Sequence, residues 1–205
     1  MRQRLYLIVD AASAAPATAE FDAALSAGDV AAVLFRGAAG ADRERLREMV
    51  AMAQRHDAAA LIEADVGLAR SLGADGVHLD SAGADVAAVR KRIGDLIVGV
   101  GGFGSRHEAM AAGEAEADYV LFGRIDEPQA DLDPRALEDA EWWAQTFVIP
   151  AVLAGGPTLD GLDDRIAAGA EFIGLEAAVW RSPDGAAAAV AAINRAFDRD
   201  AELAG

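Results

Sequence analysis

The chain has 205 residues, of which 53% are hydrophobic and 25% are charged, the size and composition of one globular domain. Its formal net charge of −16 at pH 7 disfavours binding to nucleic acid and to anionic membrane surfaces, because both carry negative charge. Cysteine is absent, which excludes disulfides, thiolate metal sites and a cysteine nucleophile. The apolar run at residues 5–9 is too short for a signal peptide or a membrane span, so we expect a cytoplasmic protein.

Short apolar runs recur along the whole chain. Runs of four or five residues that are apolar throughout are typical of strands buried on both faces of a parallel sheet. The sequence therefore predicts strands at residues 5–9, 31–35, 59–62, 76–79, 96–100, 119–122, 150–154 and 172–175.

A segment with helical spacing follows each predicted strand. In one of them Leu46, Val50 and Ala53 share a face, and charged residues occupy the opposite side of the helix. The predicted helices cover residues 17–27, 42–56, 65–72, 84–93, 105–113, 134–146, 159–168 and 185–198. Ser105 with Glu108 has the spacing of a capping box, and Thr158 or Asp160 is the expected cap of the seventh helix.

Eight strand–helix units with short connections favour a (β/α)8 TIM barrel, formed by residues 1–205 as a single domain. The alternative is a doubly wound open sheet that binds a dinucleotide. The first strand, however, runs into DAASAAPATAE at residues 10–20, which lacks the glycines of such a site. The one long connection, GRIDEPQADLD at residues 123–133, is expected to form a lid over the barrel mouth.

In a barrel the functional groups follow the strands at one end. After the seventh strand Gly155 and Gly156 let backbone N–H groups approach an anion, and Ala177 and Ala178 follow the eighth strand, so together they predict a phosphate cup. The glycines could equally form only a tight turn. Glu176 would repel a phosphate dianion if its side chain pointed into the cup.

Three further side chains are candidates for chemistry. Arg36 ends the second strand and could clamp a phosphate, although an ion pair with Glu63 on the neighbouring strand is the simpler alternative. His78 could hydrogen-bond a heterocycle or act as an acid or base, but a lone histidine in a strand is more often structural. Glu63 and Asp80 could hold a metal ion, yet on so acidic a chain they are more simply solvated acids, and we predict no metal site.

The order of several segments resembles a known family. YLIVD, VLFR, LGADGVHL, VGVGGFGSRHEA, ADYVLFG and IPAVLAGG occur in the order typical of the thiamin phosphate synthase and TenI superfamily, over about residues 4–190. The resemblance implies a TIM barrel of thiamin biosynthesis. The synthases of the superfamily join hydroxymethylpyrimidine pyrophosphate to thiazole phosphate with Mg²⁺, so magnesium is implied here by the resemblance alone.

Many residues that this resemblance would require are replaced. Arg36 remains from the motif after strand two, whose glutamine and lysine are absent, and an asparagine–aspartate pair after strand three is replaced by Glu63 and Ala64. A second metal aspartate falls on Gly83, or on Asp85 with a shift of two residues. Three further positions differ: the serine after strand five is Gly101, the histidine of the TenI branch is Arg124, and the loop lysine is missing.

Three functions stay open on these residues. The first is a synthase-like enzyme in which Glu63, Asp80 or Asp85 replaces the missing acids. The second is a different enzyme with Glu63 as base, His78 as acid or base and Arg124 or Arg36 as anion clamp. The third is a non-catalytic protein that binds a small phosphorylated heterocycle or another protein. The expected partner is a small phosphorylated heterocycle, and homo-oligomerisation is left open.

Overall fold

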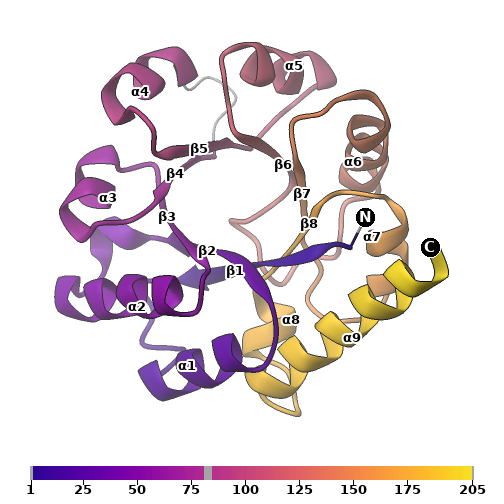
Figure 1. Ribbon diagram of the computed structural model, residues 1–205, viewed down its shortest axis with the longest axis horizontal. Helices are drawn as coiled ribbons and strands as arrows, with labels where there is room; N and C mark the ends of the chain where they lie inside the picture. Colours follow the sequence, from indigo (N-terminus) through magenta and orange to yellow (C-terminus); the bar gives the residue numbers. More distant parts are fainter. Residues whose placement is uncertain (1, 81–84, 205) are drawn as a thin grey trace.

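The computed structural model describes residues 2–80 and 85–204. Eight parallel strands pair in chain order and close into a barrel between the first and the last, with helices around the outside (Figure 1). The predicted (β/α)8 TIM barrel is confirmed. The strands are β1 (Arg4–Asp10), β2 (Val30–Arg36), β3 (Ala59–Glu63), β4 (Gly76–Leu79), β5 (Ile97–Val100), β6 (Tyr119–Gly123), β7 (Ala151–Ala154) and β8 (Phe172–Leu175).

The helices lie close to their predicted positions, with two short additions. The helices are α1 (Thr18–Ser26), α2 (Arg43–Arg55), α3 (Val66–Leu72), α4 (Val86–Ile93), α5 (Arg106–Glu114), α6 (Pro134–Thr146), α7 (Leu162–Ala167), α8 (Ala177–Trp180) and α9 (Ala186–Ala204). A 3-10 turn, η1 (Ala38–Gly40), follows β2. Neither η1 nor α8 was predicted, because three or four residues are too few for a helical period to show in the sequence.

The two cap predictions had different outcomes. The Ser105 hydroxyl accepts a hydrogen bond from the amide of Glu108 and begins α5, while the Glu108 carboxylate accepts from the amide of Gly104 at 2.6 Å. The prediction for α7 was wrong. Its cap is Gly161, in the left-handed region at φ 68°, and the Thr158 hydroxyl bonds to the Asp160 side chain instead of the helix end.

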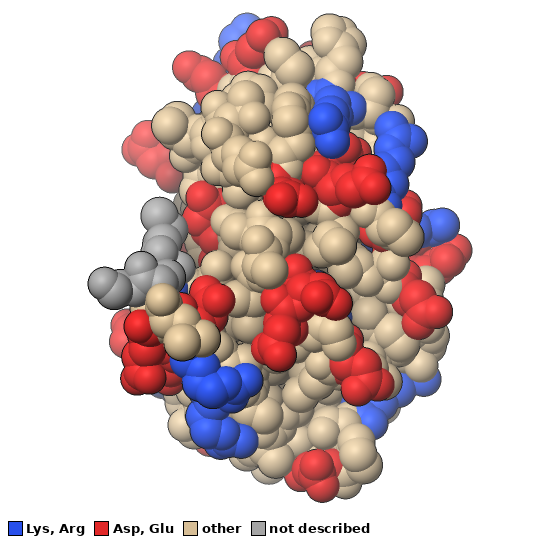
Figure 2. Space-filling view, turned by 90° about the vertical axis from the view of Figure 1, so that its right-hand side faces the viewer, with Lys and Arg blue, Asp and Glu red and all other residues tan. Residues whose placement is uncertain are grey.

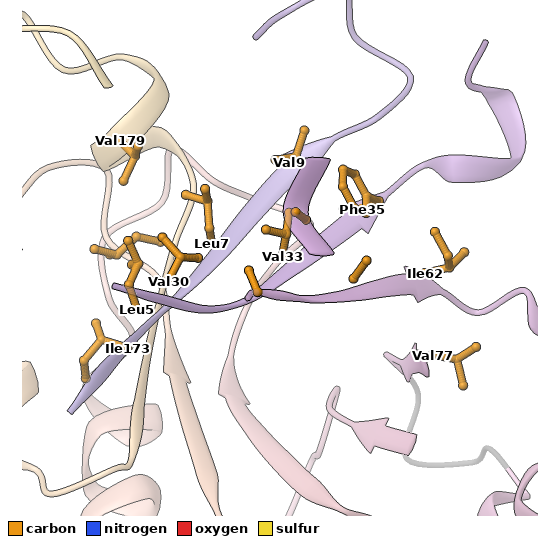
Figure 3. Close-up of a cluster of buried hydrophobic side chains, with 14 of the residues drawn as sticks. Leu5, Leu7, Val9, Val30, Val33, Phe35, Ile62, Val77, Ile173 and Val179 are labelled. Carbon is orange, nitrogen blue, oxygen red and sulfur yellow. The ribbon is translucent and has the colours of Figure 1, made fainter. Parts of the chain in front are cut away.

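Side chains along each strand alternate between two separate apolar cores. Leu7 and Val9 of β1 lie beside Val33 and Phe35 of β2 in the outer core, between the barrel and its helices (Figure 3). The inner core fills the lumen, so the interior of the barrel is packed with side chains. Its buried residues are Tyr6, Ile8, Ala32, Leu34, Leu61, Tyr119, Leu121, Ile125, Val152 and Ala154.

The connection between β6 and α6 covers the lumen at the carboxyl ends of the strands. Ile125 from this connection is only 1% exposed and belongs to the inner core. Leu132, later in the same segment, packs beside Gly155 at the end of β7. The connection therefore occupies the position expected of a lid.

The surface carries more acidic than basic side chains, as expected from 34 Asp and Glu against 18 Lys and Arg. Asp and Glu are spread widely over the side of the protein that Figure 2 shows, with Lys and Arg in smaller groups among them. Among the described residues, no helix is both long and apolar enough to cross a membrane.

Candidate functional site

The lumen-facing positions of the strands continue into polar residues at the carboxyl ends of the strands. Because side chains alternate in a strand, a residue two places beyond a lumen residue faces the same way. Asp10 follows Ile8 in this manner, and Arg36 follows Leu34. The same spacing places acids at the ends of β3, β4 and β8. We call the resulting set the mouth ring: Asp10, Arg36, Glu63, Asp80 and Glu176.

Arg36 pairs with Glu176 across the mouth ring. The Nε atom of Arg36 lies 3.6 Å from Oε2 of Glu176, and the two side chains are 14% and 13% exposed. The ion pair of Arg36 with Glu63, which the sequence left open as an alternative, does not form: Oε2 of Glu63 accepts a hydrogen bond from the amide of Gly37 at 2.7 Å. Burial raises the pKa of the Glu176 carboxyl above its ordinary value, although the Arg36 charge opposes the change.

The glycines after β7 form a loop held from behind by a buried arginine, Arg165, which is 1% exposed. Its guanidinium donates to the carbonyl oxygens of Gly155 at 2.7 Å, Thr158 at 2.9 Å and Asp160 at 2.7 Å. A Cβ atom on Gly156 would lie 2.3 Å from this guanidinium. We call residues 155–160 the glycine loop; Arg165 fixes its backbone.

Sequence reasoning missed Arg165, although a signal was present. The residue shares the inward face of α7 with Leu162 and Ile166, at the spacing of one helical turn, and all three are buried. A buried arginine needs acceptors for its N–H groups, and nearby carbonyls of a loop can supply them.

Three backbone amides at the predicted phosphate cup have no acceptor. The N–H groups of Gly156, Ala177 and Ala178 donate to no described residue, whereas that of Gly155 is used, since it donates to the carbonyl of Gly174 at 3.2 Å. Ala154 pairs with Gly174 in the β7–β8 register, so Gly156 and the start of α8 are neighbours. This arrangement supplies the N–H groups that an anion needs.

The cup is closed in this conformation. The space between Gly156 and Glu176 is about 10 Å³, with Ile125 and Pro128 of the lid among its lining residues. A space of that size holds about one water molecule. A phosphate therefore needs the lid to move and the Glu176 carboxylate to shift.

A larger cavity of about 350 Å³ lies between the segments that follow β5 and β6. Asp80 of the mouth ring and the aromatic side chain of Phe103 line it, together with Arg124. The Arg124 guanidinium binds Asp126 at 2.9 Å and Glu127 at 2.8 Å, and the hydrogen bond to Arg124 holds the pKa of Asp126 below its ordinary value. Arg124 thus faces the cavity already paired with carboxylates.

His78 lies beneath the mouth ring, inside the barrel. Its side chain is completely buried, and its Nδ1 atom is 2.9 Å from the hydroxyl of Tyr119. The Nε2 atom lies 3.9 Å from Oδ1 of Asp80, too far for a hydrogen bond, and has no partner. His78 is therefore part of the core at one end and adjoins the mouth ring at the other.

Comparison with known proteins identifies the family. A family model described as thiamine monophosphate synthase matches residues 5–179. The chain belongs to this family. The thiamine-phosphate synthase of Rhodospirillum centenum (strain ATCC 51521 / SW) is 39% identical over 94% of this chain and 96% of the relative. That of Hyphomonas neptunium (strain ATCC 15444) is 38% identical over 96% of this chain and 95% of the relative.

A solved structure, thiamine phosphate pyrophosphorylase from Pyrococcus furiosus, has the same fold. The two structures agree with a TM-score of 0.79 over 96% of each chain, at 23% sequence identity. The resemblance of the sequence to the thiamin phosphate synthase superfamily is confirmed by these matches.

The acids of this family member do not fit the magnesium site that the superfamily implies. Ala64 has no donor atom, one oxygen of Glu63 is bound to Gly37, and one oxygen of Asp85 accepts from the amide of Ala88 at 2.8 Å as the cap of α4. Gly83 lies outside the described residues. Within residues 2–80 and 85–204, no three His, Asp or Glu side chains are close enough to share a metal ion. Of Glu63, Asp80 and Asp85, Asp80 is the acid for which no hydrogen bond is found among the described residues.

Proposed function

We propose that this chain binds a small phosphorylated heterocycle at the mouth of the barrel. The observation that carries the proposal is the set of free amides at Gly156, Ala177 and Ala178, where an anion gains hydrogen bonds that the protein itself leaves unmade. The phosphate binds there, and the ring occupies the cavity lined by Asp80 and Phe103.

Electrostatics divides the site into two parts. Arg165 places a buried positive charge behind the glycine loop and so favours an anion there. The mouth ring, by contrast, has four carboxylates and one guanidinium. When Glu176 moves aside, Arg36 becomes available to the phosphate as a bidentate donor. Binding is therefore an exchange of one anion for another at Arg36.

The second candidate is the synthase reaction itself, favoured by relatives named thiamine-phosphate synthase at 38% and 39% identity over nearly the whole chain. The side chains oppose it, because Glu63 and Asp85 are engaged with backbone amides and Ala64 replaces an acid. Each missing electrostatic group typically costs a factor of about 100 to 1,000 in rate. We therefore expect turnover far below that of the relatives.

Isothermal titration of the purified protein separates the candidates. The ligands are thiazole phosphate, thiamin monophosphate and inorganic pyrophosphate, each with and without Mg²⁺. A parallel assay follows pyrophosphate release from hydroxymethylpyrimidine pyrophosphate and thiazole phosphate. Heat with thiazole phosphate, independent of Mg²⁺ and without pyrophosphate release, supports the binder. Pyrophosphate release at a rate near that of the relatives supports the synthase.

A matched pair of glycine variants locates the phosphate. Gly156→Ala places a Cβ 2.3 Å from Arg165 and should abolish phosphate binding. Gly73→Ala is the control, because Gly73 also has a left-handed φ of 70° but nothing lies within 4 Å of its Cβ position. Equal loss of binding in both variants, or no heat from the wild type with any of the three ligands, contradicts the proposal.

A further inference from the structure

Three polar side chains form a hydrogen-bonded chain across the lumen of the barrel. The hydroxyl of Tyr6 lies 2.7 Å from that of Tyr119, which lies 2.9 Å from Nδ1 of His78. All three side chains are buried, with exposures of 2%, 6% and 0%. We call this set the lumen chain. The binding site proposed above uses neither tyrosine.

The register of the strands makes room for the lumen chain. Gly99 of β5 pairs with His78 on one side and with Tyr119 on the other, so it separates them in the barrel wall. A Cβ atom on Gly99 would lie 1.9 Å from the Tyr119 ring. The missing side chain lets Tyr119 lie across β5 and reach the imidazole, with the two rings stacked at 16°.

The lumen chain allows two orders of protons, and they leave different donors without a protein acceptor. If Tyr6 donates to Tyr119 and Tyr119 donates to Nδ1 of His78, both hydroxyl protons are used and the ring proton is on Nε2. In the reverse order, the Tyr6 hydroxyl has no acceptor among the described residues. A doubly protonated imidazole requires that same reverse order. The first order leaves the Nε2–H group free, 3.9 Å from the Asp80 carboxylate, whereas the reverse order leaves a hydroxyl proton of Tyr6 free inside the lumen. A buried donor far from any acceptor is the more costly of the two, so the first order is favoured.

The two tyrosines remain donors over the working pH range. Burial raises the pKa of Tyr6 well above its ordinary value, and burial also raises that of Tyr119. Their hydroxyl groups are therefore protonated at neutral pH.

The free end of the lumen chain lies next to Asp80, which lines the cavity beside the mouth. The Nε2 atom is buried without a partner, 3.9 Å from the Asp80 carboxylate that lines the cavity. A Cβ atom on Gly101 would lie 3.1 Å from Nε2, so the glycine keeps protein atoms away from this nitrogen. An N–H group in that position can be satisfied by an acceptor atom of a ligand or by water.

We infer that Tyr119 is a positioning residue that fixes His78 as the Nε2–H tautomer, so that the ring presents a hydrogen-bond donor to the ligand beside Asp80. Tyr6 has a supporting role: Tyr119 is the acceptor within reach of its hydroxyl proton, and when Tyr6 donates there the Tyr119 proton is left for His78. The ligand part of this inference rests on the proposed function, whereas the tautomer does not.

The tautomer is measured directly, on the protein without ligand. A long-range ¹H–¹⁵N correlation spectrum shows which ring nitrogen of each histidine carries a proton. The chain has only His56, His78 and His107, so the variants His56→Gln and His107→Gln assign the signals. We expect His78 to carry its proton on Nε2 alone. A proton on Nδ1, or on both nitrogens, overturns the inference without testing the proposed function.

Two tyrosine variants separate positioning from packing. Tyr119→Phe removes the donor to Nδ1, so the His78 signals should shift and broaden as the ring loses its fixed orientation. Tyr6→Phe also deletes a buried hydroxyl but leaves the bond from Tyr119 to His78, so the tautomer should persist. Unchanged His78 signals in Tyr119→Phe overturn the inference. If Tyr119→Phe fails to fold, the wild-type spectrum and Tyr6→Phe still decide the tautomer.

Titration with thiazole phosphate extends the test to the ligand. Tyr119→Phe should weaken binding about 10-fold or more, and Tyr6→Phe by less than about 3-fold. Equal weakening in the two variants contradicts a positioning role. If the wild type itself gives no heat, the proposed function fails, and the spectrum still decides the tautomer.

Discussion

Replacing Glu176 with glutamine tests whether an internal carboxylate competes with the phosphate. Glutamine keeps the volume of the side chain and removes its charge, so the change isolates electrostatics. The Oε2 atom of Glu176 is 3.6 Å from Nε of Arg36, and both side chains are at most 14% exposed. At that distance the attraction is about 4–5 kcal/mol with an effective dielectric constant of ~20. Removal of two ions from water offsets much of it.

We expect Glu176→Gln to raise the affinity for thiazole phosphate. The ligand no longer displaces an ion pair, and a negative charge no longer faces the phosphate across a space of about 10 Å³. We estimate the gain at about 1.4–2.8 kcal/mol, which is roughly 10- to 100-fold in Kd. The magnitude is below the full attraction because part of the attraction is already offset by desolvation in the wild type.

Isothermal titration at one pH and one ionic strength measures the change. Glu202→Gln is the matched control, because it removes the same charge from an exposed position on α9. If Glu176→Gln and the wild type bind thiazole phosphate with equal affinity, the carboxylate of Glu176 does not compete with the ligand and the prediction is refuted. An equal gain in both variants assigns the effect to net charge and not to the Arg36 pair.

The remaining predictions concern pH and stability. The pKa of Glu176 is raised in the folded state, so its protonation contributes stability that is full below its ordinary pKa of 4.5 and is lost as the pH rises through the folded pKa. In urea unfolding, the free energy of unfolding of the wild type should therefore rise relative to that of Glu176→Gln as the pH falls from 7 towards 4.5. A constant difference between the two proteins over this pH range would contradict the prediction. Gly99→Ala places a Cβ within 1.9 Å of Tyr119 and should lower the free energy of unfolding by about 1–3 kcal/mol. Each kcal/mol lowers Tm by about 2–4 °C in a protein of this size. Gly67→Ala, at an exposed position of α3, should instead raise the free energy of unfolding slightly, by up to ~1 kcal/mol. An equal loss of stability in both variants would contradict the clash at Gly99. Arg165→Met loses three hydrogen bonds to the glycine loop, so the free energy of unfolding in urea should fall by about 3 kcal/mol. The same variant should lose phosphate binding. Retention of phosphate binding would show that the loop holds its shape without the guanidinium.

The sequence alone determined the order and type of the elements. Apolar runs of the length of buried strands, each followed by a helical pattern, were sufficient to predict the barrel, because a parallel sheet covered on both faces needs that alternation. It also placed the candidate residues at the strand ends, since chain order fixes which end of each strand leads into a helix. Local signals succeeded where the chemistry is local, as at Ser105, whose hydroxyl caps the helix that begins next to it.

The tertiary structure alone decided which of these residues meet. Arg36 and Glu63 end neighbouring strands, yet Glu63 binds the amide of Gly37 and the guanidinium pairs with Glu176 instead. That pair joins residues 140 positions apart, brought together when β8 closes on β1. The roles of Arg165 and Tyr119 have the same origin, because each depends on how separate segments align in space. Periodicity reports which face a side chain occupies, whereas the partner on that face is fixed by closure and register of the barrel.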